Sequence, residues 1–143
     1  MIHRAGLAIA GALALGGCGG AGQAPDAPAT GTFDAIAPDE AVHYTGTEPF
    51  WGGVAQGGMA TYTTPEDPAG RAFPVERFAG NNGLGFSGSL EGASFDLTIT
   101  PGQCSDGMSE RSYPYTATLL LGGEQRQGCA WIDSQPFSGP EAP

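Results

Sequence analysis

The fold is decided by the stretch Ala93-Ser-Phe-Asp-Leu-Thr-Ile-Thr100. Its apolar residues Phe95, Leu97 and Ile99 alternate strictly with polar or acidic ones. Because successive side chains of a strand point to opposite faces of the sheet, this alternation predicts a half-buried antiparallel strand.

Similar short runs lie on both sides of this stretch, and glycine-containing turns separate them at intervals of about ten residues. We expect strands over residues 48–55, 59–64, 71–78, 84–90, 93–100, 113–121 and 125–132. The sequence therefore predicts an all-β domain, a small antiparallel meander of six to eight strands that closes into a barrel or sandwich. With 25 glycines and 12 prolines among 143 residues, a disordered chain with local hairpins is the alternative.

The beginning of the chain has the pattern of an export signal. Arg4 precedes an uncharged apolar run, Gly6 to Leu15, which is too short to span a bilayer but suits a signal peptide. The run ends in Leu15-Gly-Gly-Cys18, which resembles the bacterial lipobox. We expect residues 1–17 to be removed and Cys18 to carry acyl chains, two or more of which give stable anchoring. The alternative is an ordinary signal peptide with an incidental cysteine.

The rest of the chain divides by composition. Residues 18–41 are rich in glycine and proline and are expected to form a lipidated tether. Residues 42–135 hold both tryptophans and all the tyrosines and form the β domain, and 136–143 are expected to be a flexible tail. Gly19 after the lipidated cysteine favours an outer-membrane location facing the periplasm.

The cysteines and the charge restrict the function further. With Cys18 committed to lipid, Cys104 and Cys129 are expected to form a disulfide in an oxidising compartment, and two free thiols binding a soft metal are the alternative. Neither a metal site nor a cofactor is expected. Loss of Arg4 leaves four arginines against 15 acidic residues, a net charge of −11, with no lysine. This charge argues against nucleic acid as a partner and fits either solubility or a cationic partner.

The first of two conspicuous motifs is Gly46-Thr-Glu-Pro-Phe-Trp51. Proline is tolerated at the start of a strand because it donates no ladder hydrogen bond. We expect Phe50 and Trp51 to plug one end of the barrel together, with Glu48 facing solvent or a polar partner.

The second motif is Cys104-Ser-Asp-Gly-Met-Ser-Glu-Arg111, which leads into Tyr113-Pro-Tyr115. Asp106 is expected to accept backbone N–H groups two or three residues later, as in an Asx-turn. Arg111 is expected to form a local ion pair with Asp106 or Glu110.

Together the motifs provide a candidate binding surface. Its members are Glu48, Phe50, Trp51, Asp106, Arg111, Tyr113 and Tyr115. The aromatic members are either structural plugs or a contact surface for a ligand or protein. No catalytic residues are expected: a Ser-His-Asp arrangement would need His43 to meet Ser105 or Ser109, and an Asp106–Glu110 acid–base pair lacks a partner nucleophile.

The motifs, with the closing Gly128-Cys-Ala130, resemble a family of uncharacterised bacterial envelope lipoproteins that is loosely related to the META-domain heat-shock lipoproteins. The resemblance covers residues 46–130 and implies a small β-rich periplasmic domain without an established activity. More loosely, the chain is similar to periplasmic inhibitors of c-type lysozyme, although their Ser-Gly-Ala signature loop is not found.

The resulting expectation is a non-enzymatic, lipid-anchored envelope protein that binds another envelope component or aids envelope maintenance. Its partners would be the membrane, through the lipid, and an envelope protein. The alternatives are an inhibitor of a basic hydrolase such as lysozyme and a carrier of a small apolar ligand.

Overall fold

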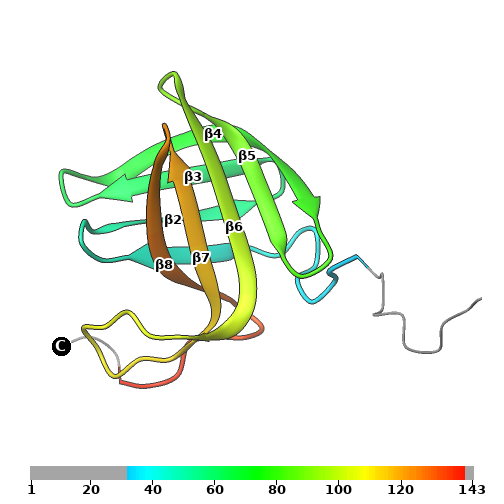
Figure 1. Ribbon diagram of the computed structural model, residues 1–143, viewed down its shortest axis with the longest axis vertical. Helices are drawn as coiled ribbons and strands as arrows, with labels where there is room; N and C mark the ends of the chain where they lie inside the picture. Colours follow the sequence, from blue (N-terminus) through cyan, green and yellow to red (C-terminus); the bar gives the residue numbers. More distant parts are fainter. Residues whose placement is uncertain (1–31, 141–143) are drawn as a thin grey trace, which may run out of the picture.

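A computed structural model describes residues 32–140 of the chain. These residues form eight antiparallel strands that close into a barrel (Figure 1). The strands are β1 (Val42–Gly46), β2 (Trp51–Gln56), β3 (Met59–Thr64), β4 (Asp67–Ala79), β5 (Leu84–Leu90), β6 (Ala93–Cys104), β7 (Tyr113–Leu121) and β8 (Glu124–Ile132). The expected leader, the lipidation site at Cys18 and most of the tether lie outside the described residues.

The predicted all-β barrel is confirmed. Each strand pairs with the next along the chain, and β8 closes the barrel by pairing with β1, from Val42 opposite Ile132 to Gly46 opposite Gly128. The strand missing from the sequence-based expectation is β1 itself. With only five residues, its apolar alternation is limited to Val42 and Tyr44.

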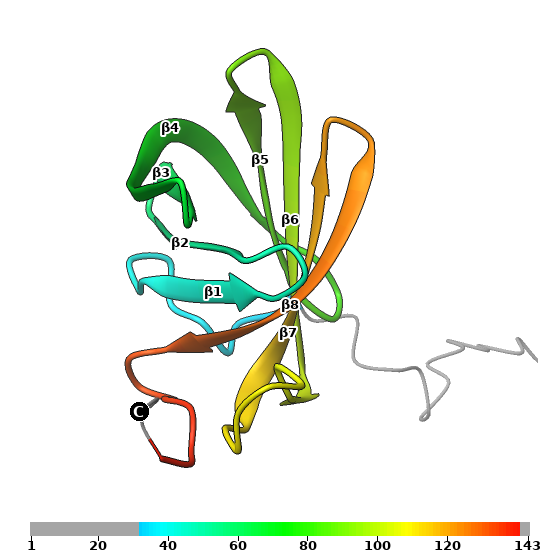
Figure 2. The same ribbon diagram turned by 90° about the vertical axis from the view of Figure 1, so that its left-hand side faces the viewer.

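The interior of the barrel is filled by side chains. In β6, Phe95, Leu97 and Ile99 are at most 1% exposed, as the alternation predicts. Aromatic rings from several strands meet inside, such as Phe73 and Phe95, whose ring centroids lie 4.8 Å apart. The long strand β4 curves as it crosses the barrel (Figure 2).

The segment before β1 packs onto the barrel, so the fold begins earlier than the expected boundary at residue 42. Ile36 is 2% exposed and belongs to the core, because its side chain covers apolar residues at one end of the barrel. The Phe33 amide donates to the Gly80 carbonyl (2.7 Å), and the Arg77 guanidinium donates to the Ile36 carbonyl (2.8 Å).

The segment after β8 is also held against the barrel. Phe137 packs against Tyr113 and Trp131, with ring centroids 5.5 and 5.4 Å away. The backbones of Ser112 and Ser138 exchange two hydrogen bonds of 2.9 Å. The expected tail at 136–143 is therefore part of the fold as far as the structure describes it, because Phe137 finds an aromatic surface to cover.

The predicted disulfide between Cys104 and Cys129 is present. Cys129 faces outward on β8, and Cys104 ends β6, so the bond holds the loop between β6 and β7 against the outer surface of β8. Within residues 32–140 no helix is long and apolar enough to cross a membrane.

Candidate functional site

The structure separates the two aromatic residues of the first motif. Trp51 is 3% exposed and lies inside the barrel, whereas Phe50 is 51% exposed in the turn before β2. The expectation that both plug the barrel is therefore wrong for Phe50. Consecutive residues of an extended chain point to opposite sides, so only one of the pair can reach the core.

Trp51 explains Gly46 of the first motif, whereas at Gly128 both the Thr45 carbonyl and the indole ring leave no room for a side chain. Gly46 and Gly128 face each other where β1 meets β8, and the indole ring packs against both. A Cβ at Gly46 would lie 2.0 Å from Trp51 Nε1, and one at Gly128 would lie 3.0 Å from Trp51 Cζ2. This part of the first motif is therefore a packing arrangement that closes the barrel.

The Asx-turn predicted at Asp106 is present. Asp106 Oδ1 accepts hydrogen bonds from the amides of Met108 (2.9 Å) and Ser109 (2.7 Å), and Oδ2 accepts one from the Ser109 hydroxyl (2.6 Å). These bonds lower the pKa of Asp106 to about 2. The Thr47 hydroxyl donates to the Asp106 carbonyl (3.2 Å), which brings the two motifs into contact.

Arg111 does not make the expected ion pair with Asp106 or Glu110. Its guanidinium instead lies 4.3 Å from the centre of the Phe137 ring and donates to the Pro140 carbonyl (3.1 Å). The Phe137 ring and the Pro140 carbonyl therefore take the place of a carboxylate as partners of this cation. Both lie more than 20 residues after Arg111, so a local sequence pattern could not reveal them.

The remaining aromatic members of the candidate surface are buried. The Tyr113 hydroxyl donates to Asp106 (3.3 Å), and the Tyr115 hydroxyl donates to Gln135. Burial raises the pKa of Tyr115. Of the seven residues proposed as one surface, Glu48 and Phe50 are exposed near each other, while the others stabilise the core, the loop or the chain end.

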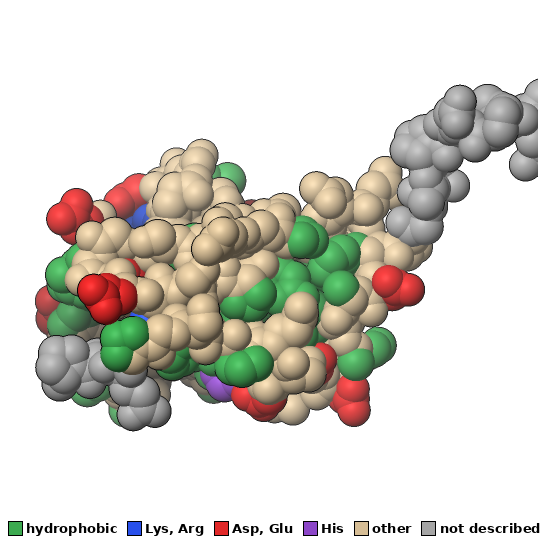
Figure 3. Space-filling model, turned by 90° about the horizontal axis from the view of Figure 1, so that it is seen from below, with side chains coloured by type: hydrophobic (Ala, Val, Ile, Leu, Met, Phe, Trp, Pro, Cys, Tyr) green, Lys and Arg blue, Asp and Glu red, His purple; other side chains and the backbone are tan. Residues whose placement is uncertain are grey.

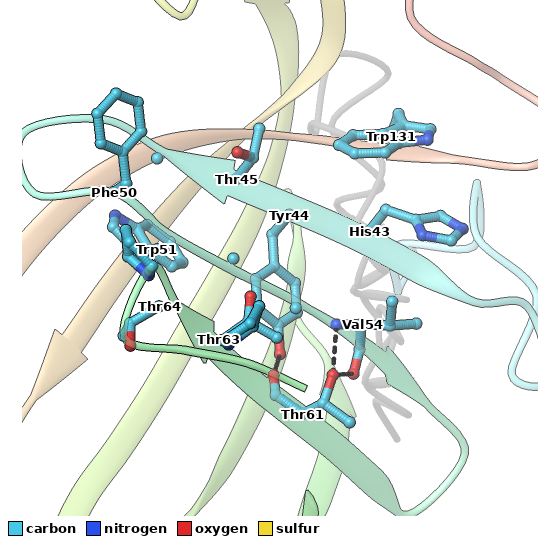
Figure 4. Close-up of a pocket in the computed structure, with 15 residues that line it drawn as sticks. His43, Tyr44, Thr45, Phe50, Trp51, Val54, Thr61, Thr63, Thr64 and Trp131 are labelled. Atoms are coloured by element: carbon cyan, nitrogen blue, oxygen red, sulfur yellow. Dashed lines mark hydrogen bonds between the residues drawn. The ribbon is translucent and has the colours of Figure 1, made fainter. Parts of the chain in front are cut away.

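Phe50 borders a groove on the outer face of β1, β2, β3 and β8, with a volume of about 490 Å³. Figure 4 shows Phe50 at one end of this outer groove and Trp131 with His43 at the other, with Thr45 between them. Pro65 and Pro68, from the turn between β3 and β4 and the start of β4, form part of its rim.

The floor of the outer groove is a row of three residues on adjacent strands. Thr45 on β1 is opposite Gly52 on β2, and Gly52 is opposite Thr63 on β3. Because Gly52 has no side chain, the row is hollow in the middle and has a threonine at each side. Within residues 32–140 neither of these threonine hydroxyls has an intramolecular hydrogen-bond partner.

The neighbouring row is bulkier and closes the groove. His43 is opposite both Trp131 and Val54, and its ring stacks on Trp131 with centroids 5.1 Å apart. The Thr61 hydroxyl accepts a bond from the Val54 amide (3.0 Å). The His43 Nε2 atom is 3.0 Å from Asp133, and the Ser109 hydroxyl donates to Asp106. Among the described residues no hydrogen bond joins His43 to Ser105 or Ser109.

Beneath the groove, the ladder between β2 and β3 is interrupted. The registered pairs stop between Gly52–Thr63 and Ala55–Ala60. In the interval the Tyr44 hydroxyl reaches from the barrel interior and donates to the Thr61 carbonyl. Burial raises the pKa of this phenol. Side-chain hydroxyls thus bond backbone groups of β2 and β3 where the ladder is interrupted, and the groove lies over this gap.

The outer groove is uncharged in an otherwise acidic molecule. Its lining contains no Asp, Glu, Lys or Arg. A second hollow of about 410 Å³, at the barrel end near Tyr62 and Leu121, differs in this respect, because Arg71 there is paired with Asp67 and Glu91. In the part of the chain that the structure describes, no three His, Cys, Asp or Glu side chains are grouped as a metal site.

The sequence patterns did not reveal the groove. Gly52 and Gly53 within a strand were its only local signal, since glycine inside a strand often marks a close backbone approach. Thr45, Thr63 and Trp131 come together only through the register of four strands. No protein-family model, curated protein or solved structure matches this chain.

Proposed function

We propose that this protein is a lipid-anchored, non-enzymatic binding protein of the bacterial envelope, and that it binds another envelope component in the outer groove. The lipobox-like Leu15-Gly-Gly-Cys18 supports the anchor and an outer-membrane location facing the periplasm. The observation that carries the binding role is the groove itself, with unpartnered hydroxyls at Thr45 and Thr63 beside the exposed ring of Phe50.

The filled interior favours surface binding over transport of an apolar molecule. Core side chains such as Phe86, Leu97 and Leu119 are at most 1% exposed and occupy the space that a carried ligand would need. Small barrels of this strand number commonly have an interior filled by side chains. A role on the outer surface therefore agrees better with the packing.

Two exposed phenylalanines allow a matched test in cells. A benzophenone amino acid replaces Phe50 in the groove or Phe78 on β4, which is 57% exposed and lies outside the groove. After irradiation we expect a discrete crosslinked product from position 50 and none from position 78. Equal products from both positions, or none from position 50, would contradict the groove as the binding site. Cys18→Ala is expected to release the chain from membranes.

The distribution of charge favours one further candidate, an inhibitor of a cationic secreted hydrolase. Within residues 32–140 each of the four arginines already has an intramolecular hydrogen-bond partner. Acidic side chains such as Glu48, Glu66 and Glu76 are exposed and have no ion-pair partner among the described residues. Figure 3 shows acidic side chains at several places on the outline of one face, with little basic surface.

Such a surface would steer a basic protein toward the chain, and the attraction would weaken with salt. The test is a cell-lysis assay with a c-type lysozyme and an excess of the purified chain. We expect slower lysis at low salt and a smaller effect at high salt. Undiminished lysis at low salt rules out this candidate.

A further inference from the structure

We infer that the occupant of the outer groove is an uncharged glycan, held with one sugar ring over Gly52. This inference rests on the proposed function, because it names the chemical class of the component bound there. Three properties of the groove lead to it: its lack of charge, its free hydroxyls and its aromatic ends.

The lack of charge selects against ionic ligands. The chain has 15 acidic residues, yet none lines the groove. An anionic polysaccharide would find no Lys or Arg in the groove lining, where His43 already contacts Asp133. It would also be repelled by nearby carboxylates, such as Glu48 and Glu66 in the turns that flank the groove. A ligand that is polar but uncharged avoids both penalties.

The free hydroxyls match the hydroxyl groups of a sugar. The backbones of Thr45 and Thr63 are two strand spacings apart across Gly52, about 9–10 Å, and the Thr63 hydroxyl leans toward Gly52. This leaves room for one sugar ring with a hydrogen bond at each side. A threonine hydroxyl can donate or accept a hydrogen bond, so it can pair with a sugar hydroxyl that accepts or one that donates.

The aromatic residues supply the apolar surface that a sugar ring also needs. Phe50 is half exposed at one end of the groove and offers such a surface. Trp131 forms the wall at the other end, where its ring is packed against His43 and Phe137. The C–H faces of a pyranose ring are apolar and pack against aromatic rings, while its hydroxyls point outward to polar partners. The absence of a side chain at Gly52 allows the ring to approach the backbone closely.

The test is a titration of the purified full-length chain, kept in a detergent without a sugar headgroup. The ligands are uncharged tetrasaccharides of glucose, N-acetylglucosamine, galactose and mannose, together with the anionic tetramer of galacturonic acid. Calorimetry measures affinity, and amide NMR shifts report the place of binding. We expect saturable binding of at least one uncharged tetrasaccharide, a shift at the Gly52 amide, and no binding of the galacturonate.

Three variants make the test specific. Thr63→Val keeps the shape but removes a free hydroxyl, and we expect affinity to fall about 3- to 10-fold. Phe50→Ala removes one aromatic end and is expected to weaken binding by at least about 5-fold. Phe78→Ala removes an equally exposed ring outside the groove and should leave affinity unchanged.

The inference is overturned if none of the uncharged tetrasaccharides binds, or if Thr63→Val and Phe50→Ala bind as tightly as the parent chain. Preferred binding of galacturonate would also overturn it. The outcome is separable from that of the proposed function: crosslinking of a protein or peptide through position 50, with no glycan binding, would leave the groove as the binding site and exclude the glycan.

Discussion

Gly46 and Trp51 offer the sharpest test of how the first motif stabilises the barrel. The three atoms nearest to a Cβ at Gly46 all belong to the Trp51 indole, at 2.0, 2.4 and 2.7 Å. Real Cβ atoms essentially never approach a neighbour within 3.0 Å, so Gly46→Ala requires the ring to move. The indole Nε1 is buried without a hydrogen-bond partner, so packing alone holds the ring.

The magnitude follows from what the ring loses. Trp51 is 3% exposed, and replacing a buried Trp by Ala costs about 3–5 kcal/mol, so a partly displaced ring should cost about 2–4 kcal/mol. In a Trp51→Leu background the obstacle is gone. There Gly46→Ala should change stability by less than about 1 kcal/mol, because alanine also reduces the freedom of the unfolded chain. The expected coupling is therefore about 2 kcal/mol.

Gly128→Ala is the comparator, because its Cβ would lie 2.3 Å from the Thr45 carbonyl oxygen, a backbone atom. Removing the indole should leave this clash in place. Urea unfolding followed by far-ultraviolet circular dichroism measures all variants without relying on tryptophan fluorescence. Additive effects of Gly46→Ala and Trp51→Leu, or equal rescue of Gly128→Ala by Trp51→Leu, would refute the packing account.

Three other outcomes are expected. Cys104→Ser removes the disulfide to Cys129, which closes a loop of 24 intervening residues, and should lower the free energy of unfolding by about 3–4 kcal/mol. Reductant should have the same effect on the parent chain. Equal melting of the parent with and without reductant would contradict this. Because the pKa of Asp106 is lowered from 3.8 to about 2, its contribution is complete above about pH 4 and disappears as the pH falls through 2. Asp106→Asn should therefore be less stable than the parent at pH 6 but not at pH 2, as measured by urea unfolding at both values; a constant difference would show that the charge is irrelevant. Ile36→Ala should cost about 2–4 kcal/mol in the same assay, and a change below 0.5 kcal/mol would mean that residues before β1 do not belong to the fold.

The features that were predictable from the sequence are those set by local patterns. Strict alternation identified β6, and its apolar residues Phe95 and Leu97 are buried. The Asx-turn at Asp106 followed from a side chain that bonds its own neighbours. The pairing of Cys104 with Cys129 followed by elimination once Cys18 was assigned to lipid.

The features that were missed depend on contacts between distant parts of the chain. Arg111 contacts the Phe137 ring and the Pro140 carbonyl rather than a neighbouring carboxylate. Ile36 lies in a stretch whose composition suggests a linker, and only the open end of the barrel makes its burial favourable. The outer groove could not be foreseen either, because the row formed by Thr45, Gly52 and Thr63 exists only after three strands have aligned.

If the chain is anchored through Cys18, as we propose, the docking of Ile36 has a mechanical consequence. Tension applied from the direction of residue 32 first loads the bond from Phe33 to Gly80 and the contact of Ile36. β1 lies behind this contact and is bonded on both sides, to β2 and β8, so tension along its axis must shear two ladders at once. The entrance segment therefore yields first under load, while the barrel wall that carries the groove keeps its shape.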